Sequence, residues 1–258
     1  MFERRLRRRN RVPLGVPVGP AQRFLGGGFG RGAKPPSEAS PQDSEGGEAP
    51  FRLMIAVVDY GRGNLGSVEK AFGRLGMAAV VTEDPSVVAD AEAVVLPGDG
   101  AFQDAMDNLG ARALLDPLRA CLDDGRPFLG ICLGYQLLFT ESEEFGQCKG
   151  LDVIPGAVRR FPPGLKIPHM GWNQVEHRGD LALFDGIPSG AHFYFVHSYY
   201  PATADSSLAV ASCTYGVSFP AAIGRGALFA TQFHPEKSQR WGLQLLENFA
   251  AFVRERRS

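Results

Sequence analysis

The sequence predicts an α/β fold: a doubly wound, mostly parallel sheet with flanking helices, plus a smaller region of antiparallel strands. Short apolar runs such as Met54–Val58 and Ala93–Leu96 show no polar alternation, as expected of parallel strands buried on both faces. Amphipathic stretches, separated from these runs by Gly-rich turns, alternate with them along the chain. Strands that alternate with helices form parallel sheets, so we expect a site beyond the carboxyl ends of the strands.

The pattern of elements changes along the chain. Strands alternate with helices up to Val153, and short strands and turns follow until one last helix. The predicted strands are Met54–Val58, Ala78–Val81, Ala93–Leu96, Pro127–Ile131, Ala157–Phe161, His192–Tyr199, Leu208–Thr214 and Ala227–Phe233. The predicted helices are Asn64–Leu75, Ala101–Asn108, Ala113–Asp123, one that begins at Tyr135, and Ser238–Arg254. No linker interrupts residues 54–258, which we expect to form one domain.

Residues 1–50 differ in composition from the rest of the chain. They contain nine Lys or Arg residues against five Asp or Glu, are rich in Gly and Pro, and show no apolar periodicity. Such a segment buries too little apolar surface to offset the entropy of ordering. We therefore expect a disordered basic extension, or translated sequence ahead of a start at Met54. A nucleic-acid-binding arm and an organellar targeting peptide are the alternatives, although acidic residues near its end are unusual for the latter.

Composition narrows the classes of function. The 258 residues are 44% hydrophobic, and the net charge of −1 indicates neither nucleic acid nor an anionic membrane as a partner. No apolar run approaches the roughly 18 residues of a membrane span. The cysteines show neither a metal-binding spacing nor the density of a disulfide scaffold, so we expect a reduced, cytoplasmic compartment and no metal. They are Cys121, Cys132, Cys148 and Cys213.

The string GICLG at 130–134 lies between a predicted strand and a predicted helix. It has the form of a nucleophile elbow, with glycines where side chains would clash in so tight a turn. The turn would present the thiol of Cys132 at a helix N-terminus, where the partial positive charge lowers the pKa of a thiol. A buried structural cysteine beside a turn is the alternative.

Two further strings follow strands whose carboxyl ends should meet at the same edge of the sheet. In His234-Pro235-Glu236, the residue before proline is extended, so the two ionisable side chains should face one site, with the carboxylate orienting the imidazole. In PGDG at 97–100, the glycines allow backbone N–H groups to turn toward an oxyanion, although alone the string could be an ordinary turn. Together with Cys132, these strings indicate acyl transfer through a thioester.

Longer strings resemble a known family. GICLGYQLL at 130–138 and QFHPEKS at 232–238 resemble the class I (triad) glutamine amidotransferases, whose fold is flavodoxin-like. The strings DYGRGN at 59–64, PGDGAF at 97–102, KIPHMGWN at 166–173 and YFVHSYY at 194–200 are similar to the glutaminase subunits of imidazole glycerol phosphate synthase. The resemblance, from Met54 to the C-terminus, implies a heterodimer that needs no cofactor. Its glutaminase hydrolyses glutamine to glutamate and passes ammonia to the cyclase subunit, which forms imidazole glycerol phosphate and AICAR in histidine biosynthesis.

The same resemblance implies a role for individual residues. Cys132 would attack the glutamine amide, His234 would transfer the thiol proton to ammonia, and Glu236 would hold the imidazole. The oxyanion would be bound by the N–H of Leu133 and by a peptide N–H at Asp99 in the 98–100 loop. The implied substrate-binding groups are Gln136 and the main chain of Gly100, Ser198 and Tyr199. The implied contacts to the cyclase subunit and the ammonia passage are Asn64, Trp172, Asn173 and Lys237.

Two residues depart from the family pattern. Tyr135 stands where Met is usual, and we expect its ring to face the core or the interface. Asp99 stands where a small Val is usual. A carboxylate aimed at an oxyanion would oppose it, so we expect Asp99 to point toward solvent or a cation. Core packing is the alternative for Trp172, and a solvated surface charge is the alternative for Lys237.

Three other functions are compatible with parts of the sequence. A free-standing or differently partnered glutaminase, such as the pyridoxal phosphate synthase type, would share the Cys-His-Glu residues but lack PHMGWN. A non-catalytic scaffold would be expected to lose one of these residues, and all three are present. A nucleotide site is suggested by the glycines at 61, 63 and 66, but no ribose-binding acid follows in the right context.

Overall fold

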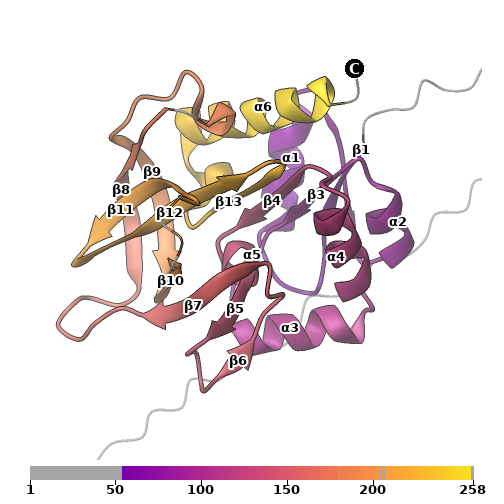
Figure 1. The fold of residues 1–258 in the computed structure, drawn as a ribbon. Helices are drawn as coiled ribbons and strands as arrows, with labels where there is room; N and C mark the ends of the chain where they lie inside the picture. The colour runs from indigo at the N-terminus through magenta and orange to yellow at the C-terminus, as the bar shows by residue number, and fades with distance from the viewer. Residues whose placement is uncertain (1–53, 180, 204, 206, 257–258) are drawn as a thin grey trace, which may run out of the picture. The chain divides into compact units, whose positions relative to one another are not determined.

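Two sheets with flanking helices form the described part of the chain, residues 54–179, 181–203, 205 and 207–256 of a computed structural model (Figure 1). The extension predicted at residues 1–50 lies outside these residues, so that interpretation stays a prediction. Among the described helices, none has the length and apolar character to cross a bilayer.

The larger sheet contains nine strands in the order β2-β1-β3-β4-β13-β12-β11-β8-β9, and the predicted α/β fold class is confirmed. Its parallel half comprises β2 (Ala78–Thr82), β1 (Met54–Val58), β3 (Ala93–Leu96), β4 (Phe128–Ile131) and β13 (Leu228–Thr231). Its antiparallel half comprises β12 (Val217–Arg225), β11 (Ala209–Tyr215), β8 (His169–His177) and β9 (Ala191–His197). The smaller sheet comprises β10 (Tyr199–Thr203), β7 (Ile154–Arg160), β5 (Phe139–Ser142) and β6 (Cys148–Lys149).

Each face of the parallel half packs on its own set of helices (Figure 1). Along β1, Ile55 and Val57 belong to one core, and Ala56 and Val58 belong to the other. The first core includes α1 (Leu65–Arg74) and α6 (Gln239–Glu255), which lie side by side. The second includes α2 (Pro85–Asp90), α3 (Phe102–Ala111) and α4 (Leu115–Asp123). Because both faces are covered, every position of such a strand is apolar, which is why the strands could be located from composition alone.

Several element boundaries differ from the predictions. The predicted strand His192–Tyr199 is two strands in different sheets, since β9 ends at His197 and β10 begins at Tyr199. The strands β8 and β12, and the short pair β5 and β6, have no predicted counterpart, because polar residues and a proline interrupt their apolar pattern. Helix α2 was also not predicted, although Asp84 caps it by accepting from the N–H of Ser86. Asn64 occupies the N-cap of α1, but its side chain makes no capping bond.

Tyr135 faces the core and not an interface. Its side chain is fully buried, and its ring lies edge-on to Phe139 at a centroid distance of 5.5 Å. Burial raises the pKa of its hydroxyl, which has no hydrogen-bond partner within the described residues. A buried hydroxyl without a partner costs free energy relative to water, so this departure from the family pattern is a local source of instability.

We therefore predict that Tyr135→Phe stabilises the fold by about 1 kcal/mol, because it removes the unpaired hydroxyl and keeps the ring. Tyr215→Phe is the matched control. The Tyr215 hydroxyl donates to the carbonyl oxygen of Lys166 at 2.6 Å, so its loss should destabilise the fold. Chemical denaturation of the two variants measures both effects. A destabilised Tyr135→Phe would show that the hydroxyl has a partner after all.

Candidate active site

Cys132 lies on a strained turn between β4 and the single helical turn α5 (Leu133–Gln136). Its φ of 55° and ψ of −104° lie outside the regions that residues with a side chain normally occupy. A Cβ atom at Gly134 would overlap the carbonyl oxygen of Leu96, and one at Gly130 would lie 3.0 Å from the carbonyl oxygen of Gly134. The two glycines are therefore required for β3, β4 and α5 to meet around this turn.

The environment of the thiol differs from the prediction in one respect. The expected helix N-terminus is weak, because α5 has only four residues. The helix macrodipole builds up over several turns, so the nearby ionisable side chains matter more here. The thiol of Cys132 lies 3.9 Å from the carbonyl oxygen of Val196, and Nε2 of Gln232 donates to the sulfur at 3.6 Å. Cys132 is 6% exposed, so its sulfur is largely shielded from water.

His234 and Glu236 form a buried pair beside this site. Nδ1 of His234 lies 2.9 Å from Oε1 of Glu236, and the two side chains are 5% and 1% exposed. His234 is extended and faces one site with Glu236, as predicted, but β13 ends at Thr231 and not at Phe233, and Pro235–Lys237 form a 3-10 turn. Proline favours the first position of such a turn, which folds the carboxylate back toward the ring. The backbone of the imidazole residue is held by a bond from its N–H to the carbonyl oxygen of Tyr194.

The charge state of His234 depends on its neighbours. Burial alone would lower its pKa, but Cys132 and Glu236 outweigh burial and raise the pKa to about 10. The raised pKa favours the protonated ring, and in general an imidazolium beside a sulfur stabilises the thiolate. Since Nδ1 is engaged by Glu236, Nε2 is the ring atom left to exchange a proton with the thiol of Cys132 or with a substrate.

In the loop after β3, a peptide N–H at Asp99 was predicted to bind the oxyanion. The peptide between Gly98 and Asp99 instead directs its carbonyl oxygen toward the N–H of Leu133. The N–H of Leu133 donates to the carbonyl oxygen of Gly98 at 3.4 Å, so this donor is engaged within the protein. Asp99 is exposed, and its Oδ1 accepts the N–H of Gly63 at 3.1 Å. Its carboxylate is thus bonded to the loop after β1. Gly100 is exposed and has a φ of 91°, which only glycine adopts readily.

Gln136 is buried and its side-chain amide is fixed by two acceptors. Nε2 donates to the carbonyl oxygen of Tyr199 and to Oε1 of Gln232, at 3.0 Å in both cases. The carbonyl oxygen of Ser198 accepts the N–H of Phe161 at 3.2 Å. Gln232 was missed as a site residue by the sequence analysis, yet it connects Gln136 to Cys132. Its position two residues before His234 in the string QFHPEKS was the available signal.

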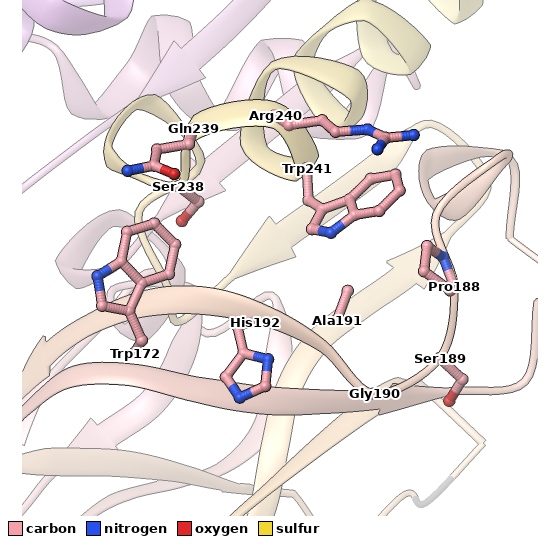
Figure 2. A pocket seen from close by; sticks show the side chains of 10 residues that line it. All are labelled: Trp172, Pro188, Ser189, Gly190, Ala191, His192, Ser238, Gln239, Arg240 and Trp241. Carbon is pink, nitrogen blue, oxygen red and sulfur yellow. The ribbon is translucent and has the colours of Figure 1, made fainter.

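The residues predicted to face a partner lie on the surface to different degrees. Trp172 is 46% exposed and the neighbouring Met170 is 62% exposed, so core packing of Trp172 is wrong. Lys237 is exposed, whereas Asn64 and Asn173 are half-buried. Figure 2 shows Trp172 beside a surface pocket of about 640 Å³, with Gln239, Arg240 and Trp241 along its other wall. No group of three or more metal-ligating side chains occurs in the described part of the chain.

Comparison with known proteins assigns the chain to a family. The family model of the class-I glutamine amidotransferases matches residues 56–252. The chain belongs to this family. This amidotransferase is 54% identical over 203 residues to imidazole glycerol phosphate synthase subunit HisH of Syntrophotalea carbinolica, covering 76% of this chain and 98% of the relative. It is also 54% identical over 200 residues to the subunit HisH of Moorella thermoacetica, covering 78% and 95%.

A solved structure supports the fold of this amidotransferase. PurLQS from Thermotoga maritima superposes with a TM-score of 0.63 at 18% identity, covering 79% of this chain and all of the other. At this level of identity the likeness concerns the arrangement of strands and helices alone. The close sequence relatives, and not this structure, narrow the branch of the family.

The four cysteines of this amidotransferase should differ in reactivity. We predict that iodoacetamide at neutral pH alkylates Cys132 at least about tenfold faster than the others, because only this sulfur lies beside an imidazolium. Burial raises the pKa of Cys121 to about 11 and that of Cys213 to about 12, and it also raises the pKa of Cys148. Mass spectrometry of the alkylated peptides gives the four rates. His234→Ala should remove the preference for Cys132. Equal rates for the four cysteines in the unsubstituted chain would contradict the pairing of a Cys132 thiolate with a protonated His234.

Proposed function

We propose that the chain is the glutaminase subunit of imidazole glycerol phosphate synthase. It hydrolyses glutamine and passes the ammonia to a cyclase subunit, in the histidine pathway. One observation supports this chemistry most directly. His234 and Glu236 form a buried hydrogen bond close to Cys132, whose backbone is strained at the nucleophile elbow. The choice of this branch of the family is supported by relatives at 54% identity, which bear that subunit's name and are covered over 95–98% of their length.

The proposed reaction proceeds through a thioester. The thiolate of Cys132 attacks the side-chain amide carbon of glutamine, and the C–N bond breaks as His234 donates its proton to the departing ammonia. The neutral imidazole then takes a proton from water, which attacks the thioester and releases glutamate with the sulfur as leaving group. Glu236 holds the ring in one orientation and stabilises its charged form in both steps.

Glutamine binding is assigned to residues around Cys132 that the family resemblance implies. Gln136 and main-chain groups of Gly100, Ser198 and Tyr199 are the proposed contacts. Because Nε2 of Gln136 already donates to two protein acceptors, its Oε1 atom is the part of this amide that could accept from the substrate's amino group.

The partner is proposed to dock near β8 and the residues that follow the triad. Trp172, Asn173, Lys237 and Asn64 would contact the cyclase subunit. The exposed side chains of Met170 and Trp172 support this, because large exposed apolar side chains that lie close together often mark a protein-binding surface. Trp172 also lines the surface pocket of Figure 2. We assign the heterodimer to the cytoplasm, since the four cysteines are free. Residues 1–50 are proposed to be a dispensable extension of the amidotransferase domain at 54–258.

Docking is proposed to complete the oxyanion hole. In the present arrangement the carbonyl oxygen of Gly98 accepts the N–H of Leu133, so that donor cannot serve an oxyanion. A rotation of the peptide between Gly98 and Asp99 would release this N–H and turn a second N–H toward the same point. Glycine tolerates the required change of backbone angles at little cost. A partner that binds the rotated form better would therefore switch the site on.

We predict that Cys132→Ala abolishes release of glutamate from glutamine, because no other group can form the thioester. Synthesis by the complex with the cyclase subunit should persist when ammonium salts replace glutamine. The control is Cys121→Ala, which removes a buried thiol of α4 that the proposed chemistry does not use. Glutamate is measured by a coupled assay. If Cys132→Ala still hydrolyses glutamine, the thioester mechanism is incorrect.

We further predict that the complex with the cyclase subunit and its nucleotide substrate releases glutamate about 10²–10³ times faster than the chain alone, the effect of one oxyanion donor. Lys237→Ala should reduce this activation more than it reduces the basal rate. Assays of the chain alone, with the cyclase, and with the cyclase and substrate separate the contributions. A chain that alone turns over at the rate of the complex would favour a free-standing glutaminase.

A further inference from the structure

Two buried histidines take no part in the reaction described above. His169 on β8 and His197 on β9 lie opposite each other in the antiparallel ladder and are 4% and 6% exposed. Nδ1 of His169 lies 2.9 Å from Nε2 of His197. A contact between two imidazole nitrogens requires that one carries a hydrogen and the other does not. The direction of this bond follows from the groups at the two ends of the pair.

The first end is the side-chain amide of Asn173. Its Oδ1 accepts the N–H of Gln174 at 2.8 Å, and its Nδ2 donates to the carbonyl oxygen of Thr214 at 3.1 Å. These main-chain partners determine which atom of the amide is nitrogen. The same Nδ2 lies 3.1 Å from Nε2 of His169 and donates to it. Nε2 of this ring is therefore unprotonated, and its hydrogen is on Nδ1.

The other end is the carbonyl oxygen of Tyr199. Nδ1 of His197 lies 2.7 Å from this oxygen, which can only accept, so Nδ1 carries the hydrogen. Nε2 of His197 is then free to accept from His169. The assignment from Asn173 and the assignment from Tyr199 agree at the bond between the rings. Both histidines are neutral Nδ1–H tautomers, and reversing either would set two hydrogens or two lone pairs against each other.

The surroundings of the pair favour this neutral, fixed state. The ring of His169 is stacked between Tyr215, at a centroid distance of 4.1 Å, and Phe195, at 4.9 Å. Phe161 and Phe219 pack against His197 at 5.2 and 5.3 Å. Burial among these rings lowers the pKa of His169 to about 4 and that of His197 to about 3.

The carbonyl oxygen of Tyr199 joins the pair to the nucleophile. It accepts a second bond, from Nε2 of Gln136, which also donates to Oε1 of Gln232. Nε2 of Gln232 donates in turn to the sulfur of Cys132. Both lone pairs of one carbonyl are thus used, one by the histidine pair and one by the amide that faces the glutamine site.

We propose that His169 and His197 are positioning residues: a tautomer-locked pair that holds the Tyr199 carbonyl and, through it, the amide of Gln136 in the orientation that binds glutamine. The proposal rests on the proposed function, in which Gln136 contacts the substrate. The chain of hydrogen bonds begins at Asn173, which is next to the exposed Trp172. The strand β8 that is proposed to contact the partner therefore also helps to orient the side-chain amide of Gln136. Histidine suits this role because one ring donates and accepts at opposite sides.

Two substitutions of His169 separate the two nitrogens. In His169→Asn, the side-chain nitrogen can replace Nδ1 and still donate to His197. In His169→Gln, the longer amide reaches the place of Nε2 but leaves His197 without a donor. His197 can then adopt the other tautomer, whose Nδ1 lone pair opposes the Tyr199 carbonyl. The matched control is His177→Gln on the same strand, whose ring nitrogens have no hydrogen-bond partner within the described residues.

The test uses the full chain in complex with the cyclase subunit and measures KM and kcat for glutamine. We expect His169→Gln to raise KM about fivefold, the effect of one hydrogen bond, with a smaller change in kcat. His169→Asn and His177→Gln should stay within about twofold of the original KM, since neither removes that bond. Equal increases in the Gln and Asn variants, or an unchanged KM in His169→Gln, would overturn the proposal.

A second measurement needs neither a variant nor activity. Nitrogen-15 NMR of the full chain at neutral pH should show His169 and His197 both as Nδ1–H tautomers. An Nε2–H tautomer or a doubly protonated ring at either residue would also overturn the proposal. Failure of the proposed function is recognised separately, because it would appear as glutamine hydrolysis by Cys132→Ala whatever the state of the two histidines.

Discussion

The pairing of β4 between β3 and β13 is the constraint on which the site depends. Leu96 pairs with Gly130 on one side, and Thr231 pairs with Ile131 on the other. The three parallel strands therefore end at the same level. The residues that follow them, in the loop at 97–100, at Cys132 and at 232–236, meet at one edge of the sheet. A shift of one residue in either register would move every side chain to the opposite face and separate the nucleophile from the imidazole.

Burial of charge at this edge is balanced by mutual pairing. A thiolate, an imidazolium and a carboxylate would each pay a large desolvation cost alone, and removing any one leaves the others uncompensated. The raised pKa of His234 shows the balance: burial opposes the charged ring, and the neighbouring sulfur and carboxylate outweigh burial. The strained backbone of Cys132 is tolerated because Gly130 and Gly134 let the surrounding strands close around it.

Two hydrogen-bond paths converge on the carbonyl oxygen of Tyr199. One runs from Asn173 through the histidine pair, and the other runs from Gln136 through Gln232 to the nucleophile. The loop at 97–100 is held by two bonds, one between Asp99 and the loop after β1 and one from the N–H of Leu133 to the carbonyl oxygen of Gly98. Leu133 and Gln136 lie on the same helical turn α5, so the 97–100 loop contacts the turn that also carries the side-chain amide of Gln136.

The sequence by itself determined the parallel strands and the three strings that supply the site. Continuous apolar runs identify strands covered on both faces, and glycines flanking a cysteine identify a turn that no larger residues allow. Those signals are local, because each depends on residues within a few positions of one another.

Only the tertiary structure decided what depends on register between distant segments. His169 meets His197 across β8 and β9, and Gln136 meets Gln232 although 96 positions separate them. Neither contact leaves a periodic signal in the sequence. The exposure of Trp172, the fold of Pro235–Lys237 into a 3-10 turn and the engagement of Leu133 by Gly98 were likewise beyond local patterns. Each is set by which atoms the packed sheet brings together, and a local pattern does not contain that information.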